Sequence, residues 1–271
     1  MKLSMWRVGT ATAALLVAVV NTAALAQSTG DIPRAGSDVR TRPKHPGPQG
    51  ESLDSIKQLP DFGGVWAPPL PGKGGVRSPP AGKPSLTPAY KAKLDAYNAA
   101  KARGENTQTE HANCQPFAYP SSMGLYPIEF LMTPGKVTIA IETDSQMHRI
   151  FTDGRPPNDD PDLSFQGYAI GHWEGDTLVS EVRGLVPAPQ MEIVTGAGHS
   201  DKLKITQRAR LVSRDVLEIQ WTYDDVEALT QPWVVTRLYE RHRDWDIQEY
   251  NCTQNNRDAA DEKGRPTMRL D

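Results

Sequence analysis

The stretch from residue 167 to 182 constrains this chain most, because it has the pattern of a β-hairpin with a predictable register. Gly175 and Asp176 separate two runs with strand character, and they suit a two-residue type I′ or II′ turn because glycine tolerates a positive φ. One side of the hairpin is then apolar or small and the other is mixed, as in a wall between core and water. The predicted pairs are Glu174 with Thr177, Trp173 with Leu178, Gly171 with Ser180 and Ala169 with Val182.

Most of the chain beyond Cys114 shows strand patterns joined by short turns. A short apolar run at 61–66 could add an edge strand. About nine strands, with no room for crossover helices, predict a mainly β fold. We expect an antiparallel up-and-down meander closed into a lipocalin-like barrel or a strongly rolled sheet. The predicted strands are 128–133, 136–142, 147–152, the hairpin 168–183, 203–212, 216–223, 233–242 and 245–250.

One helix is predicted before these strands, over residues 89–103. Thr87 is a suitable N-cap, Pro88 suits the first helical position, and Gly104 marks the end. Apolar residues at i, i+4 and i+7, beginning at Tyr90, give the helix one narrow face. The helix should therefore pack by that face on the outside of the sheet.

The first 26 residues have the composition of a signal peptide. Lys2 and Arg7 precede a small, apolar stretch at 8–23, and an A-x-A cleavage pattern occupies 24–26. Polar residues interrupt the apolar stretch, which disfavours the alternative of a membrane anchor. We expect an exported protein, periplasmic or secreted, with a flexible Gly- and Pro-rich leader at 27–60 and a single domain at 61–271.

The chain has two cysteines, Cys114 and Cys252. In an exported protein they should form a disulfide. Closing so long a loop contributes roughly 4–5 kcal/mol in the chain-entropy model. Neither a lone nucleophilic cysteine nor a cysteine-rich zinc site accounts for two isolated thiols.

The net charge disfavours two classes of partner. Of the 30 basic residues, 28 remain after loss of Lys2 and Arg7, against 33 acidic ones, which gives about −5. Nucleic acid and anionic membrane are therefore poor candidates, and a small organic ligand is the expected partner. The sequence does not predict the oligomeric state.

Period-2 patterns indicate which side chains face the interior, but they leave two orientations open for 233–242 and 245–250. With the aromatic sides inward, Arg237 and Glu249 come in as well and must bond each other or a ligand, because a buried unpaired charge costs several kcal/mol. In the other orientation Val234 and its alternate neighbours face inward and the charges lie in water. The first orientation predicts a ligand pocket. Its lining would be Arg149, Gln207, Arg237, Glu249, Trp221, Tyr223 and Tyr239.

Three histidines are candidate acid–base groups, because a neutral-range pKa allows a side chain to take and give a proton: His148, His172 and His199. The alternative for His172 is a surface position beside Glu181. His199 and Ser200 are adjacent, and adjacent residues seldom form a working triad. No G-x-S-x-G motif is present, which disfavours a serine hydrolase.

An acidic loop at 153–162 could hold Ca²⁺ through several carboxylates. It lacks the EF-hand spacing, and a proline-rich surface turn is the alternative. No other metal and no organic cofactor are predicted. The candidate calcium ligands are Asp153, Asp159, Asp160 and Asp162.

Five segments resemble a widespread family of exported bacterial proteins usually labelled hypothetical: IFTDGRPPNDDPD, YAIGHWEGDTLV, GHSDKLKITQRARLV, ALTQPWVVTRLYER and IQEYNCTQNN. The resemblance covers roughly 61–257, and the motifs are specific in order and spacing. It implies a common fold and supplies no reaction. The family usually has Ser at the position of Ala169 and Arg at that of His172, which weakens a catalytic role for His172.

Together these observations predict an exported β-barrel protein that binds a small, largely apolar organic molecule with a polar head. The first alternative is a lyase, hydratase or isomerase without an organic cofactor, acting by acid–base catalysis in the lumen. Its catalytic candidates are Glu249, Arg237, His199 and His172. The second alternative is an envelope structural or interaction protein with a filled core.

Overall fold

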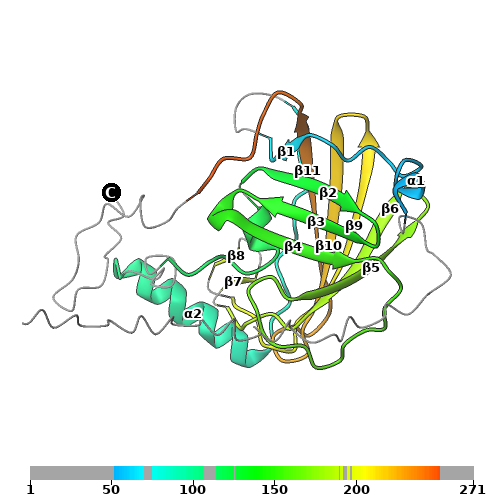
Figure 1. The fold of residues 1–271 in the computed structure, drawn as a ribbon. Helices are drawn as coiled ribbons and strands as arrows, with labels where there is room; N and C mark the ends of the chain where they lie inside the picture. Colours follow the sequence, from blue (N-terminus) through cyan, green and yellow to red (C-terminus); the bar gives the residue numbers. More distant parts are fainter. Residues whose placement is uncertain are drawn as a thin grey trace, which may run out of the picture. The chain divides into compact units, whose positions relative to one another are not determined.

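Nine strands form a closed barrel in the order β1-β11-β10-β9-β6-β5-β4-β3-β2 (Figure 1). The computed structural model describes residues 52–69, 75–105, 114–124, 126–188, 190–191, 194–195 and 197–250. The predicted mainly β fold, closed into a barrel, is confirmed. The signal-peptide prediction falls outside the described residues.

The barrel strands follow the chain in order around the wall. They are β1 (Val65–Ala67), β2 (Ile128–Thr133), β3 (Lys136–Ile141), β4 (Gln146–Phe151), β5 (Tyr168–Glu174), β6 (Thr177–Arg183), β9 (Lys204–Ser213), β10 (Val216–Asp224) and β11 (Trp233–His242). Two short strands, β7 (Gln190–Met191) and β8 (Val194–Thr195), pair separately. The helical elements are α1 (Leu53–Ile56), α2 (Pro88–Ala102) and the 3₁₀ turns η1 (Ser121–Met123) and η2 (Thr143–Ser145).

The β5–β6 hairpin has the predicted register, with Trp173 opposite Leu178 and Gly171 opposite Ser180. Gly175 has the positive φ (58°) that the turn requires. Trp173 lies in the core, 8 % exposed. Gly171 allows close packing, because a Cβ there would lie 2.7 Å from the Ile150 side chain.

Neighbouring strands are antiparallel around the barrel, with one exception at β4 and β5. These two strands pair in parallel, with Ile150 opposite Ala169. The connection at 152–167 contains the proline-rich acidic loop, and it returns the chain so that β5 starts in the same direction as β4. The predicted meander is thus interrupted once.

The short strand β1 closes the barrel and does not form an edge as predicted, because it pairs with both β11 and β2. Arg241 on β11 fixes this closure. Its guanidinium lies over the Trp66 ring, 4.3 Å from the centroid, and donates to the Asp61 carboxylate at 2.9 Å and to the Asp61 carbonyl at 2.6 Å. Burial raises the pKa of Asp61, but hydrogen bonds from the Gly63 amide and Arg241 outweigh it, so the pKa of Asp61 falls below its usual value.

The predicted strand at 245–250 is wrong. No strand is present there, and the segment runs along the outside, where the Gln248 amide donates to Glu142 Oε2 at 3.0 Å. The cause is that β1 already occupies the edge of β11, with Trp66 opposite Arg241. Residues 245–250 therefore find no free strand to pair with.

The predicted helix is confirmed as α2, with Tyr90 as its buried residue. The Thr87 amide and hydroxyl, just before it, donate to the carbonyls of Ala228 and Glu227 at 2.9 and 2.7 Å, which ties the helix start to the loop before β11. The predicted flexible leader is not uniform, because α1 lies inside its last residues and begins with a capping box at Ser52. Among the residues described, no helix is long and apolar enough to span a membrane.

Candidate functional site

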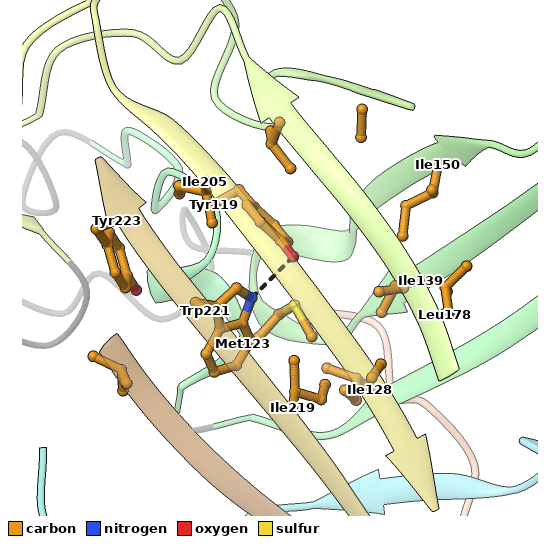
Figure 2. Packing of buried hydrophobic residues seen from close by; sticks show 14 of the residues in the cluster. Tyr119, Met123, Ile128, Ile139, Ile150, Leu178, Ile205, Ile219, Trp221 and Tyr223 are labelled. Carbon is orange, nitrogen blue, oxygen red and sulfur yellow. Dashed lines mark hydrogen bonds between the residues drawn. The ribbon is translucent and has the colours of Figure 1, made fainter. Parts of the chain in front are cut away.

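The orientation of β11 matches the first of the two predicted alternatives for residues 233–242 only. Trp233, Val235 and Tyr239 are buried, whereas Val234 is 46 % exposed. The aromatic side of this strand therefore faces the interior, as do the sides of β3, β9 and β10 that carry Val137, Ile205 and Leu217. These inward residues form one continuous apolar core (Figure 2).

A loop segment at 117–124, containing η1, fills part of the barrel interior. Tyr119 and Met123 are 1 % and 0 % exposed, and Figure 2 draws both among the buried core side chains. The Tyr119 amide donates to the Phe165 carbonyl at 2.7 Å, and the Tyr239 hydroxyl donates to the Met123 carbonyl at 3.1 Å. The interior is thus occupied largely by the protein's own side chains.

A group of buried polar side chains lies around Tyr119. We call it the Tyr119 cluster; its members are Tyr119, His148, Ser180, Gln207 and Trp221, and each is at most 2 % exposed. They come from the 117–124 segment and from β4, β6, β9 and β10, so the barrel closure brings them together. Trp221 and Ser180 both stand opposite Gln207 on the strands that flank β9.

Two donors fix the amide of Gln207. The Tyr119 hydroxyl and the Trp221 indole Nε1 both donate to Gln207 Oε1, the latter at 3.0 Å. The indole also lies 3.0 Å from the Tyr119 oxygen. Because indole N–H can only donate, the oxygen of Gln207 faces these groups and its NH₂ points elsewhere.

His148 stacks on Tyr119, with ring centroids 3.8 Å apart and ring planes 13° apart. Its Nδ1 lies 3.0 Å from the Gln166 carbonyl. A carbonyl only accepts, so Nδ1 carries the proton and Nε2 is the bare acceptor. Burial lowers the pKa of His148 to about 3, which keeps the ring neutral near pH 7.

Three atoms of the Tyr119 cluster have no hydrogen-bond partner among the described residues: His148 Nε2, Ser180 Oγ and Gln207 Nε2. Buried polar groups in folded proteins are nearly always bonded, and each exception calls for an explanation such as a ligand. The three atoms offer an acceptor, a hydroxyl and an amide donor.

The predicted pocket residues divide into two groups. Gln207, Trp221, Tyr223 and Tyr239 are buried in the barrel, and Arg237 lies on the inward side of β11 at intermediate burial. The inward prediction is wrong for Arg149, which is exposed because the alternate residues His148 and Ile150 of β4 face inward.

The inward prediction is also wrong for Glu249, which is exposed on the segment that follows the barrel. The predicted Arg237–Glu249 pair on adjacent strands is therefore not formed.

Neither of the two proposed catalytic histidines lies in the Tyr119 cluster. His172 is on the outer surface, and its Nε2 lies 3.1 Å from Glu174 Oε1. His199 is buried, and burial lowers its pKa. The neighbouring Ser200 hydroxyl donates to Asp225 at 2.8 Å and not to a histidine, so no nucleophilic triad forms.

The acidic loop gives the calcium hypothesis no support. Asp153 accepts two hydrogen bonds from the Arg155 guanidinium, at 2.8 and 2.6 Å, and one from the Arg155 amide at 3.3 Å. Asp159, Asp160 and Asp162 are exposed. Within the described ranges, no group of three or more acidic, histidine or cysteine side chains is placed to hold a metal ion.

Among the described residues no cysteine is free, so Cys114 is not a free thiol. Its predicted partner, Cys252, lies outside the described residues. The Cys114–Cys252 disulfide therefore stays a prediction.

Sequence reasoning did not identify Tyr119 and Ser180 as site residues. Ser180 could have been found from the hairpin register, which already placed it on the inward side opposite Gly171. Tyr119 lies in a loop without periodicity, and its position depends on contacts with distant strands. His148 was missed as a pocket residue because Arg149 was predicted to face inward, and adjacent residues of a strand point to opposite faces.

No protein-family model matches this chain, and no curated protein matches it. The resemblance of its motifs to a family of exported bacterial proteins remains a prediction. The structure does show where two of the motifs lie. YAIGHWEGDTLV covers β5, the turn and the first residues of β6, and GHSDKLKITQRARLV contains most of β9.

Proposed function

We propose that this protein binds a small, largely apolar organic molecule whose polar head lies at the Tyr119 cluster. The observation that carries the proposal is the set of three buried, unpartnered atoms among the described residues: His148 Nε2, Ser180 Oγ and Gln207 Nε2. Each such atom costs about 1–3 kcal/mol when it stays unbonded. A ligand that bonds to all three would recover much of that free energy.

The surroundings of the cluster suit an apolar body. Val182 and Ile205 stand opposite each other on β6 and β9, one step from Ser180 and Gln207 on the inward side. Ile139 stands opposite His148 on β3. All three are fully buried, so the part of the ligand beyond its head would contact aliphatic side chains.

Binding is favoured over acid–base turnover. A general base works best with a pKa near the working pH, and burial holds the pKa of His148 at about 3. The predicted partner Glu249 lies outside the barrel.

The filled interior supports the second candidate, a structural or interaction protein, because Met123 and Tyr119 occupy space that an open cup would leave to a ligand. The signal-peptide composition supports export for either function.

A retention experiment separates these two candidates. Purified full chain is incubated with cell extract and washed, and the retained compounds are identified by mass spectrometry. The matched variants are Gln207→Leu inside the barrel and Gln220→Leu on β10, whose side chain bonds Thr236. We expect a retained compound with wild type and Gln220→Leu, and its loss with Gln207→Leu. If no compound is retained by wild type, the structural candidate replaces the proposal.

A further inference from the structure

We propose that the head of this ligand is uncharged and both donates and accepts hydrogen bonds, as a carboxamide or a hydroxyl group does. The inference rests on the proposed function and narrows it from a polar head to one class of head group. It follows from the hydrogen-bonding roles left open in the Tyr119 cluster.

His148 requires a donor. Its Nδ1–H is bonded to the Gln166 carbonyl, which fixes the tautomer and leaves Nε2 with a lone pair directed away from that bond. The ring is fully buried and stacked on Tyr119, so a flip of the ring would lose the bond to Gln166. A ligand atom at Nε2 must therefore carry a hydrogen.

Gln207 requires an acceptor. Its oxygen is taken by the Tyr119 hydroxyl and the Trp221 indole, so its two N–H groups are what it can offer. Ser180 stands directly opposite Gln207 on β6, and its hydroxyl can donate or accept. A head group that bonds to both side chains would have to accept a hydrogen bond from Gln207 while it donates one to His148.

Three other kinds of head group fail this test. A ketone has no hydrogen for His148. A carboxylate has none either, and it would face the His148 lone pair. An ammonium group cannot accept from Gln207. No member of the cluster is a charged side chain, so either ion would also be buried without a counter-charge, at a cost of several kcal/mol.

The Tyr119 hydroxyl is a neutral group inside the barrel that both donates and accepts a hydrogen bond. It donates to Gln207 Oε1 and accepts from Trp221 Nε1 at 3.0 Å. Burial raises the pKa of Tyr119, so the group stays an uncharged phenol. One neutral donor–acceptor group is thus held on one side of Gln207, and the ligand head would take the corresponding role on its other side.

The test uses the full chain labelled with ¹⁵N-histidine, with His148→Gln to assign the His148 signals. Four probes of similar size are titrated at pH 8: acetamide, acetone, acetate and methylammonium. We expect acetamide to shift the His148 Nε2 resonance saturably in the direction of an accepted hydrogen bond, and the other three to leave it unchanged. Gln207→Leu should abolish the acetamide response, and Gln220→Leu should keep it.

Two outcomes overturn the inference, and they differ in what else they reject. If acetone, acetate or methylammonium shifts the resonance as strongly as acetamide, the head-group class is wrong while a binding site remains. If none of the four probes shifts it, the Tyr119 cluster is not a ligand site, and the proposed function loses its site as well.

Discussion

Burial of a neutral histidine inside the barrel makes the stability of this protein sensitive to acid. The pKa of His148 is 6.5 in an unfolded chain and about 3 in the barrel, where burial disfavours the charged ring. The unfolded chain therefore takes up a proton before the folded one does. The stability that His148 contributes is complete above pH 6.5 and is lost progressively as the pH falls toward 3.

The size of the effect follows from these two pKa values. Between pH 8 and pH 5, protonation of the unfolded chain at this one residue should lower the free energy of unfolding by about 2 kcal/mol. The assay is urea denaturation of wild type and His148→Gln at both pH values. Glutamine keeps a donor for the Gln166 carbonyl and removes the titration, so the loss on acidification should be about 2 kcal/mol smaller in the variant.

His199 is also buried with a lowered pKa, and its contribution has the same sign. It is present in both proteins, so it cancels in the comparison. His172→Gln is the matched control, because His172 is exposed, and it should lose as much stability as wild type. If His148→Gln and wild type lose the same free energy within about 0.5 kcal/mol, the spread expected of a neutral surface change, His148 is not buried as described.

Two further predictions concern the framework of the barrel. Trp173→Ala should lower the free energy of unfolding by about 3–5 kcal/mol, because Trp173 is buried and packs edge-on against Phe62 with ring centroids 5.7 Å apart. The control is Trp245→Ala, at a partly exposed position, which should lower the free energy of unfolding by less than about 1 kcal/mol. Equal losses for the two variants in urea denaturation would contradict this packing. Ellman titration of the unfolded, unreduced protein should find no free thiol, since we expect Cys114 and Cys252 to pair, and two free thiols would reject the pairing.

The β5–β6 hairpin could be predicted pair by pair because its information is local. A Gly-Asp turn sets the register, and the period of two then assigns every side chain to a face. The same rule correctly predicted the inward side of β9 and β10, where apolar residues alternate with polar ones. The bounds of the helix α2 could also be predicted from the sequence, because Thr87 and Pro88 mark its start and Gly104 marks its end.

The polar site depended on contacts between segments far apart in the sequence. His148 and Gln146 face inward on β4, where the 117–124 segment and Gln166 supply their hydrogen-bond partners. Phe151, on the other side of β4, packs against Tyr168 and under Arg155. Alternation along a single strand cannot reveal such partners.

Residues 245–250 show the same difference between local sequence signals and long-range contacts. Their alternation is that of a strand, and local propensity alone would place Glu249 on a barrel wall. A strand also needs a free edge to pair with, and β1, more than 160 residues earlier in the chain, occupies the edge of β11. Turn residues and the alternation of apolar and polar side chains act over a few residues, so they can be predicted from the sequence. Which edge is already taken, and which loop fills the interior, is decided by the closure of the whole barrel.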